Sequence, residues 1–373
     1  MKRGASLLVV ASLAILILGL AMSVGLSRMA KDLPRPLADI ARMPGRAWVR
    51  LFPPRVHRST RLVTLTEPER RAAKALGRQV AGLVVWSSNR SGNHELYLLD
   101  LPARSVRQLT HHPNVDFFSR FSPDGRRLLF LRSQREETSA RDKSGWDLML
   151  MNVDGTGEQV LARGAYHPTW VGDGSGILFE RGMQFVRFDL VTRRETVLLD
   201  GAKNFPGVSE LGDVELSPDG RRLAFGLRGT FSGVFGLSRE FSGAVVLDLD
   251  GRALAILTRE QACQTTWTPD SRGVLWMETG GQGGTRVMTA TPDGTDRRVL
   301  MDLPGARSHE YFPKLSNDGR WLVWAASAEG HEHDRADYDI FVWRVGTPWE
   351  RAIRLTQHPG NDQWPDLWIR PVR

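Results

Sequence analysis

The sequence predicts an all-β protein: a six-bladed β-propeller of four-stranded blades, preceded by an N-terminal transmembrane or signal helix and a linker. Three observations predict this fold. A turn motif recurs at a period near 50 residues, short apolar strands follow each turn, and the strands left over at the two ends of the repeat complement each other. A period in this range is typical of repeated supersecondary units, and four strands per unit are typical of a propeller blade.

In the usual form of the recurring turn, a hydroxyl residue is followed by proline and then by Asp-Gly. Proline presets φ for the first turn position, and Asp and Gly tolerate the conformations that follow. Departures from the pattern include Gly172 in place of proline and Ser271 in place of glycine. The five copies lie 46 to 51 residues apart and are centred on Asp124, Asp173, Asp219, Asp270 and Asp318.

Each turn leads into an apolar second strand, such as residues 127–130, and then a third strand, such as residues 147–151. A fourth strand often ends in Leu-Thr, as at residues 109–110, 257–258 and 355–356. Five complete blades are therefore expected to begin near residues 117, 165, 212, 262 and 310.

The sixth blade is predicted from the two ends of the repeat. Residues 82–110 supply second, third and fourth strands without a first strand, and residues 363–369 supply a first strand with nothing after it. Joined, the two segments complete a blade and close the ring, which removes exposed sheet edges.

Before the propeller, the sequence predicts a membrane segment over residues 1–30 and a basic linker over residues 31–80. An uncharged, mostly apolar run over residues 5–26 follows a basic start and is long enough to span a bilayer. Its length favours a retained anchor, although small residues near its end leave cleavage open. In the linker, Thr66 and Glu69 have capping-box spacing, so a short helix is expected to run to about Leu76 and stop at Gly77.

Charge is divided unevenly along the chain. Residues 1–80 carry 15 Lys and Arg against 4 acidic residues, whereas the remainder carries 35 against 38. A nucleic-acid groove needs its basic surface on the folded domain, so no nucleic-acid partner is expected. The single cysteine, Cys263, excludes a disulfide framework within the chain and zinc sites built from several cysteines.

The repeat resembles that of TolB-like propellers, in residues 87–97 and in the turns at Ser122 and Ser217. The resemblance covers residues 81–373. It implies an extracytoplasmic scaffold that binds a protein or peptide partner in an envelope complex, with the propeller facing the periplasm. The positive-inside rule conflicts with this orientation, because more basic residues follow the apolar run than precede it. A cytoplasmic propeller therefore stays open.

The upper face, formed by the loops between second and third strands and between blades, is the expected binding face, because eight of the nine histidines and the long loops fall there. The alternative is a divalent metal at the pore mouth, in a metal-dependent enzyme such as a polysaccharide lyase, or else a carbohydrate-binding module. Against a metal, His112 with Asp116 repeats as His358 with Asp362, which indicates blade-consensus residues that bond nearby backbone. No nucleophile elbow is present, so no catalytic residues or cofactor are assigned. The predicted face comprises His94, His111, His112, Asp116, His167, His309, Glu310, His358 and Asp362.

Overall fold

The computed structural model describes residues 65–371, except for residues 137, 141, 233–236, 238, 283, 305–308, 328–335 and 358–359. The predicted membrane segment and most of the linker lie outside the described residues. Over residues 65–371, apart from those gaps, no helix combines the length and the apolar character needed to cross a membrane.

Helix α4 (Glu67–Gln79) is the helix predicted in the linker. The Thr66 hydroxyl accepts a hydrogen bond from the Glu69 backbone N–H, and the Glu69 carboxylate accepts one from the Thr66 N–H at 2.7 Å, which confirms the capping box. The predicted stop at Gly77 is wrong, because the helix continues beyond it. Gly77 instead allows close packing, since a Cβ there would lie 2.2 Å from the Leu101 carbonyl oxygen.

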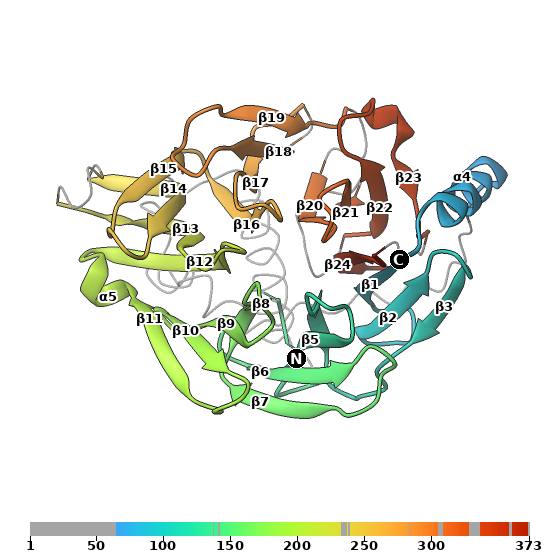
Figure 1. The fold of residues 1–373 in the computed structure, drawn as a ribbon, viewed down its shortest axis with the longest axis horizontal. Helices are drawn as coiled ribbons and strands as arrows, with labels where there is room; N and C mark the ends of the chain where they lie inside the picture. The colour runs from blue at the N-terminus through green and yellow to red at the C-terminus, as the bar shows by residue number, and fades with distance from the viewer. Residues whose placement is uncertain are drawn as a thin grey trace, which may run out of the picture. The chain divides into compact units, whose positions relative to one another are not determined.

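The described residues form 24 strands in six antiparallel four-stranded sheets, arranged radially as Figure 1 shows. Three sheets, each given from its innermost strand outward, are β24 (Asp362–Ile369), β1 (Gly82–Ser88), β2 (Glu95–Asp100), β3 (Ser105–Gln108); β4 (Asp116–Phe121), β5 (Arg127–Ser133), β6 (Trp146–Asn152), β7 (Gln159–Arg163); and β8 (Tyr166–Trp170), β9 (Gly176–Arg181), β10 (Gln184–Asp189), β11 (Glu195–Asp200).

The other three sheets are β12 (Val208–Leu216), β13 (Arg222–Thr230), β14 (Glu240–Asp248), β15 (Leu254–Thr258); β16 (Ala262–Trp267), β17 (Val274–Thr279), β18 (Thr285–Ala290), β19 (Arg298–Met301); and β20 (His309–Leu315), β21 (Trp321–Ser327), β22 (Tyr338–Arg344), β23 (Ile353–Arg354). Two short helices, α5 (Gly201–Asn204) and η4 (Trp349–Arg351), lie in connections. The predicted six blades are thereby confirmed, although two of the three Leu-Thr pairs follow their strand rather than end it.

Strand β24 completes the blade that begins with β1, as the leftover strands predicted. The two strands pair antiparallel, with Val84 opposite Leu367 and Ser88 opposite Asp362. The first and last parts of the propeller are thus joined within one sheet, and the ring has no open end.

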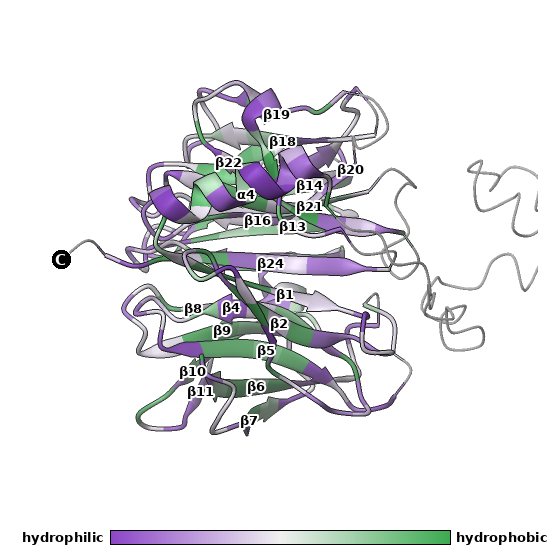
Figure 2. Ribbon diagram, turned by 90° about the vertical axis from the view of Figure 1, so that its right-hand side faces the viewer, coloured by the Kyte–Doolittle hydropathy of each residue, from purple (hydrophilic) through white to green (hydrophobic). Residues whose placement is uncertain are grey.

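Each blade contributes one buried aromatic side chain from its second strand. Burying a large aromatic ring between adjacent sheets supplies much apolar contact area, so these residues hold the blades together. Figure 2 shows the hydrophobic colour concentrated along the strands, whereas α4 is largely hydrophilic. The six aromatic residues are at most 1% exposed and are Trp86, Phe130, Phe179, Phe225, Trp276 and Trp324.

The recurring turns share one hydrogen-bonding pattern on the lower face, which is the face that carries the tight turns between first and second strands. In the first copy the Ser122 hydroxyl donates to Asp124 Oδ1 at 2.5 Å. The same bond recurs at Ser217, Thr268 and Ser316.

The departures at Ser271 and Gly172 have physical reasons. Ser271 takes a left-handed conformation (φ 59°) where the first copy has Gly125 (φ 69°). Gly172 is required because a Cβ there would lie 2.3 Å from the carbonyl oxygen of Pro218 in the neighbouring blade.

Candidate functional site

Each innermost strand carries one non-glycine residue in the left-handed region, at a β-bulge where its pairing with the second strand shifts register. Such a bulge re-aims a side chain, and a left-handed conformation costs a non-glycine residue roughly 1–2 kcal/mol. The same strained backbone conformation recurs in all six blades, so it is a regular feature of the centre of this propeller. The six residues are Phe118, His167, Asp213, Gln264, Phe312 and Trp364, and we call them the bulge ring.

One side of the bulge ring is an aromatic stack. The Trp364 ring lies between Phe118 and Phe312, with centroid distances of 3.5 and 3.8 Å. Phe118 then meets the His167 imidazole edge-on at 4.8 Å. These aromatic contacts fill one side of the central channel.

The other side of the bulge ring is polar. His167 Nε2 lies 2.8 Å from Asp213 Oδ1, and the Phe312 backbone N–H donates to Gln264 Oε1 at 2.5 Å. A cavity of only about 30 Å³ lies among these side chains, roughly the space of one water molecule. The bulge ring therefore narrows the channel between the two faces.

A charged cluster continues from the polar side toward the upper face. His167 Nδ1 lies 2.8 Å from Glu180 Oε1, so both imidazole nitrogens meet a carboxylate. Lys143, from the β5–β6 loop, donates to Glu180 Oε2 at 3.3 Å and to the Leu211 carbonyl oxygen at 3.1 Å. Two cationic and two anionic groups are thereby held together, and Glu180 is almost fully buried.

The cluster fixes the protonation states of its members. Burial lowers the pKa of His167, but the carboxylates of Asp213 and Glu180 outweigh it and leave that pKa raised. Burial raises the pKa of both carboxylic acids, yet the charges of His167 and Lys143 outweigh it and leave both pKa values lowered. The two carboxylates therefore favour the imidazolium form of His167.

A pocket of about 170 Å³ opens beside this cluster, between the blade of β12–β15 and the blade of β16–β19. Arg228 and Glu210, about half exposed, form a 3.4 Å ion pair in its wall. Asp213 belongs both to this pocket and to the bulge ring. The pocket also contains Lys143, Gly212, Gly226, Leu227, Ser242, Gly243, Gln261, Ala262, Cys263, Met277 and Thr279.

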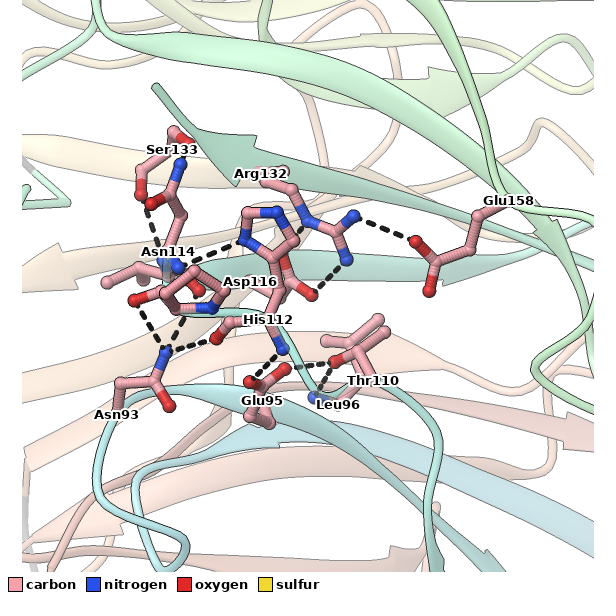
Figure 3. Close-up of polar contacts among 12 residues, drawn as sticks. Asn93, Glu95, Leu96, Thr110, His112, Asn114, Asp116, Arg132, Ser133 and Glu158 are labelled. Carbon is pink, nitrogen blue, oxygen red and sulfur yellow. Dashed lines mark hydrogen bonds and ion pairs between the residues drawn. The ribbon is translucent and has the colours of Figure 1, made fainter. Parts of the chain in front are cut away.

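The predicted site residues of the first blades serve internal contacts, as Figure 3 shows. Asp116 is fully buried and accepts two hydrogen bonds from Arg132, at 2.8 and 2.7 Å. The His112 backbone N–H donates to Glu95 Oε1 at 2.6 Å, and its ring Nδ1 accepts the Asn114 N–H at 3.0 Å. The His112 ring therefore stabilises the connection between β3 and β4, and Asp116 binds Arg132 of the neighbouring strand β5.

Asp362 repeats the arrangement of Asp116 in the last blade. It is fully buried and accepts two hydrogen bonds from Arg90, at 3.0 and 2.8 Å. His94 is also buried and lies 3.2 Å from the Ser87 hydroxyl through Nδ1. Neither side chain is exposed to a partner in this structure.

Glu310 and the remaining histidines differ from one another in their surroundings. Glu310 is fully buried, accepts hydrogen bonds from the Leu303 N–H and the Thr285 hydroxyl, and has its pKa raised to about 8 by burial. His111 is exposed in the β3–β4 connection. His167 and His309, predicted in loops, lie instead within β8 and β20, near the start of each strand.

The predicted residues do not converge on one metal centre in the described part of the chain. There, no group of three or more His, Cys, Asp or Glu side chains is arranged to hold a metal ion. His358, a member of the predicted set, lies outside the described residues. A metal at the pore mouth stays a hypothesis.

A fixed spacing in the sequence marks the positions of the bulge ring, but the varied residue types at these positions hide it. In five blades the bulge residue stands six positions before the Asp of the turn, from Phe118 before Asp124 to Phe312 before Asp318. Because this position holds phenylalanine in two blades and histidine, aspartate and glutamine in the other three, composition does not connect its residues. Lys143 and Glu180 gave no signal at all, since a long stretch of sequence separates the two partners.

Comparison with known proteins supports the fold. No family model and no curated protein matches the sequence. Among solved structures, TolB from Acinetobacter baumannii is 13% identical, with 83% of this chain and 88% of that chain covered and a TM-score of 0.48. A TolB-type protein from Agrobacterium tumefaciens is 15% identical, with 79% and 99% covered and a TM-score of 0.52.

Hydrazine synthase from Kuenenia stuttgartiensis is 14% identical, with 83% of this chain and 50% of that chain covered and a TM-score of 0.56. Identities this low show a shared fold and leave function to the site. The described residues form a TolB-like six-bladed β-propeller.

Proposed function

We propose that this protein is a membrane-tethered scaffold whose propeller faces the periplasm and holds a protein or peptide partner on its upper face. The apolar run over residues 5–26 supports the tether. The TolB-like fold supports a binding role, since propellers present loops and pockets on a rigid frame.

The upper-face pocket carries this proposal. It places exposed charges of both signs, Arg228 and Glu210, beside the buried apolar side chains Leu227 and Met277. Binding pockets commonly combine an apolar wall with a few placed polar groups. A pocket of about 170 Å³ suits one or two side chains of a partner.

The chemistry of the same region favours binding over catalysis. With both nitrogens engaged by carboxylates and its pKa raised, His167 is poorly suited to act as a general base. Burial raises the pKa of Cys263 well above its ordinary value, and Asp213 adds to the effect. The thiol therefore stays protonated and is a weak nucleophile.

Photocrosslinking in native membranes tests the partner. A benzophenone amino acid at Arg228 should give a discrete adduct, whereas the same group at Val191, 84% exposed on the lower-face β10–β11 turn, should not. Identical adduct patterns at both positions would contradict an upper-face partner.

Sidedness is tested separately. Alkaline phosphatase fused after residue 373 should be active, because this enzyme requires an oxidising compartment. An inactive alkaline phosphatase fusion together with an active cytoplasmic reporter would place the propeller inside the cell.

The metal-dependent alternative has its own test. Elemental analysis of the purified protein should find no stoichiometric metal. A stoichiometric metal that is lost when His112 and His358 are substituted together would replace the scaffold proposal with the enzyme.

A further inference from the structure

The lower face carries a funnel of about 380 Å³ that reaches from the Asp-Gly turns toward the bulge ring. Three tryptophans line it, Trp170, Trp267 and Trp368, and each indole N–H donates to a backbone carbonyl oxygen at 3.1–3.2 Å. These bonds fix the rings in place, so the funnel presents rigid aromatic surface to a ligand.

Four charged side chains also line the funnel, from positions two residues after a bulge. Three of them are well partnered. Asp366 accepts the backbone N–H groups of Phe121 and Leu367 at 2.8 and 2.9 Å. Lys314 pairs with Glu215 and donates to the Thr266 hydroxyl at 3.2 Å, while Glu215 also accepts the Trp267 N–H at 3.2 Å.

Arg120, the fourth charged group, keeps most of its donors available. Within the described residues, its guanidinium makes one hydrogen bond, from Nη1 to the Ser119 carbonyl oxygen at 2.8 Å, although a guanidinium has five N–H donors. Its positive charge also repels that of Lys314. Burial, and then this repulsion by Arg120, lower the pKa of Lys314. The charge of Asp366 already attracts Arg120, and a bound anion would use the remaining donors and further offset the repulsion.

We propose that the funnel binds a small organic carboxylate. The acid group would make a bidentate contact with Arg120, and its apolar part would pack on the tryptophan rings. A planar guanidinium matches a carboxylate in geometry, and both bonds are charge-assisted. The bulge ring separates this site from the upper-face pocket.

Calorimetric titration of the full-length protein in detergent tests the proposal with indole-3-acetate, its neutral amide and tryptamine. We expect the acid to bind at least about tenfold more tightly than the amide, and the amine to bind weakest. Glycyl-glycyl-tryptophan with a free carboxylate tests whether the acid group can come from a peptide end. Equal affinities for acid and amide, a preference for the amine, or no binding of either acid at about 1 mM would overturn the proposal.

Arg120→Gln should lower the affinity for indole-3-acetate at least about tenfold, to that of the amide, whereas Arg272→Gln, an exposed arginine on the same face outside the funnel, should not. Thr169→Leu keeps all four charges and narrows the funnel, and it should weaken binding with the melting temperature unchanged. This variant keeps the test decisive if Arg120→Gln fails to fold. Wild-type affinity in a folded Arg120→Gln or Thr169→Leu variant would refute the site.

Discussion

The two sides of the bulge ring share one backbone conformation and differ completely in side-chain chemistry. On the aromatic side the Trp364 ring lies within 4 Å of Phe118 and of Phe312, centroid to centroid, and on the polar side the His167 imidazole lies between two carboxylates. The comparison shows that the blade repeat fixes where six side chains meet and leaves their chemistry free. The aromatic side contributes stability through packing, whereas the polar side contains titratable groups whose contribution to stability depends on pH.

Trp364→Ala should have the largest effect, because it removes the central ring of the aromatic side. Substitutions of this kind in a core cost about 3–5 kcal/mol, through lost burial and the cavity left behind. Chemical denaturation measures the loss of unfolding free energy. Trp349→Ala is the control, since Trp349 is 41% exposed and should change stability by less than about 0.5 kcal/mol. Equal losses in the two variants would show that the aromatic side does not stabilise the ring.

Asp213→Asn should come next, at about 2 kcal/mol, because a charge-assisted bond to His167 becomes a neutral one within a buried cluster. The pKa of His167 should fall in this variant, which NMR titration of the imidazole measures. Asp250→Asn, at an exposed ion pair with Arg221, should leave both quantities unchanged. If the pKa of His167 did not change in Asp213→Asn, the charge of Asp213 would not act on His167.

The polar side should also make stability depend on pH. Since the pKa of His167 is raised above its ordinary value of 6.5, its contribution is complete below pH 6.5 and is lost as pH rises through the folded-state pKa. Glu180 and Asp213 have lowered pKa values, so their contributions are present above their ordinary values of 4.5 and 3.8 and are lost in acid. Denaturation of the wild type and of His167→Gln between about pH 4 and pH 9 should show the largest difference in unfolding free energy near about pH 5–6. A difference that does not change with pH would mean that His167 is neutral.

Gln264→Leu should have the smallest effect of the series. The variant loses the acceptor for the Phe312 N–H and should cost about 1 kcal/mol. Gln134→Leu, at an exposed hydrogen bond to Asp147, should stay within about 0.5 kcal/mol of the wild type in the same denaturation assay. A loss near that of Trp364→Ala would erase the distinction between the two sides.

The fold was predictable because its determinants are local and repeated. Each turn motif encodes its own hydrogen bonds, and the strand at residues 363–369 has no partner unless it returns to the first blade. The helix end at Gly77 was mispredicted because the decisive contact, with Leu101, is tertiary. Local propensity did not contain that information.

The site was less predictable because its residues come from different blades. Histidine was a misleading guide: His94 and His112 are used in internal contacts, and His167 became notable only through Glu180 and Asp213. Buried ion pairs such as Arg132 with Asp116 depend on strand register, which composition alone does not reveal.

The joining of β24 to β1 has a consequence for biosynthesis. A chain made from its N-terminus exposes the edge of β1 until β24 is synthesised, because β24 is the strand that pairs with this edge. Trp364 arrives on the same strand, so the ring of blades and the aromatic stack in its channel are completed together. Folding of this propeller is therefore expected to finish in one late step of long sequence separation, slow compared with the assembly of single blades. During that interval the nascent protein carries an open channel and an unprotected sheet edge, and it is then most vulnerable to aggregation.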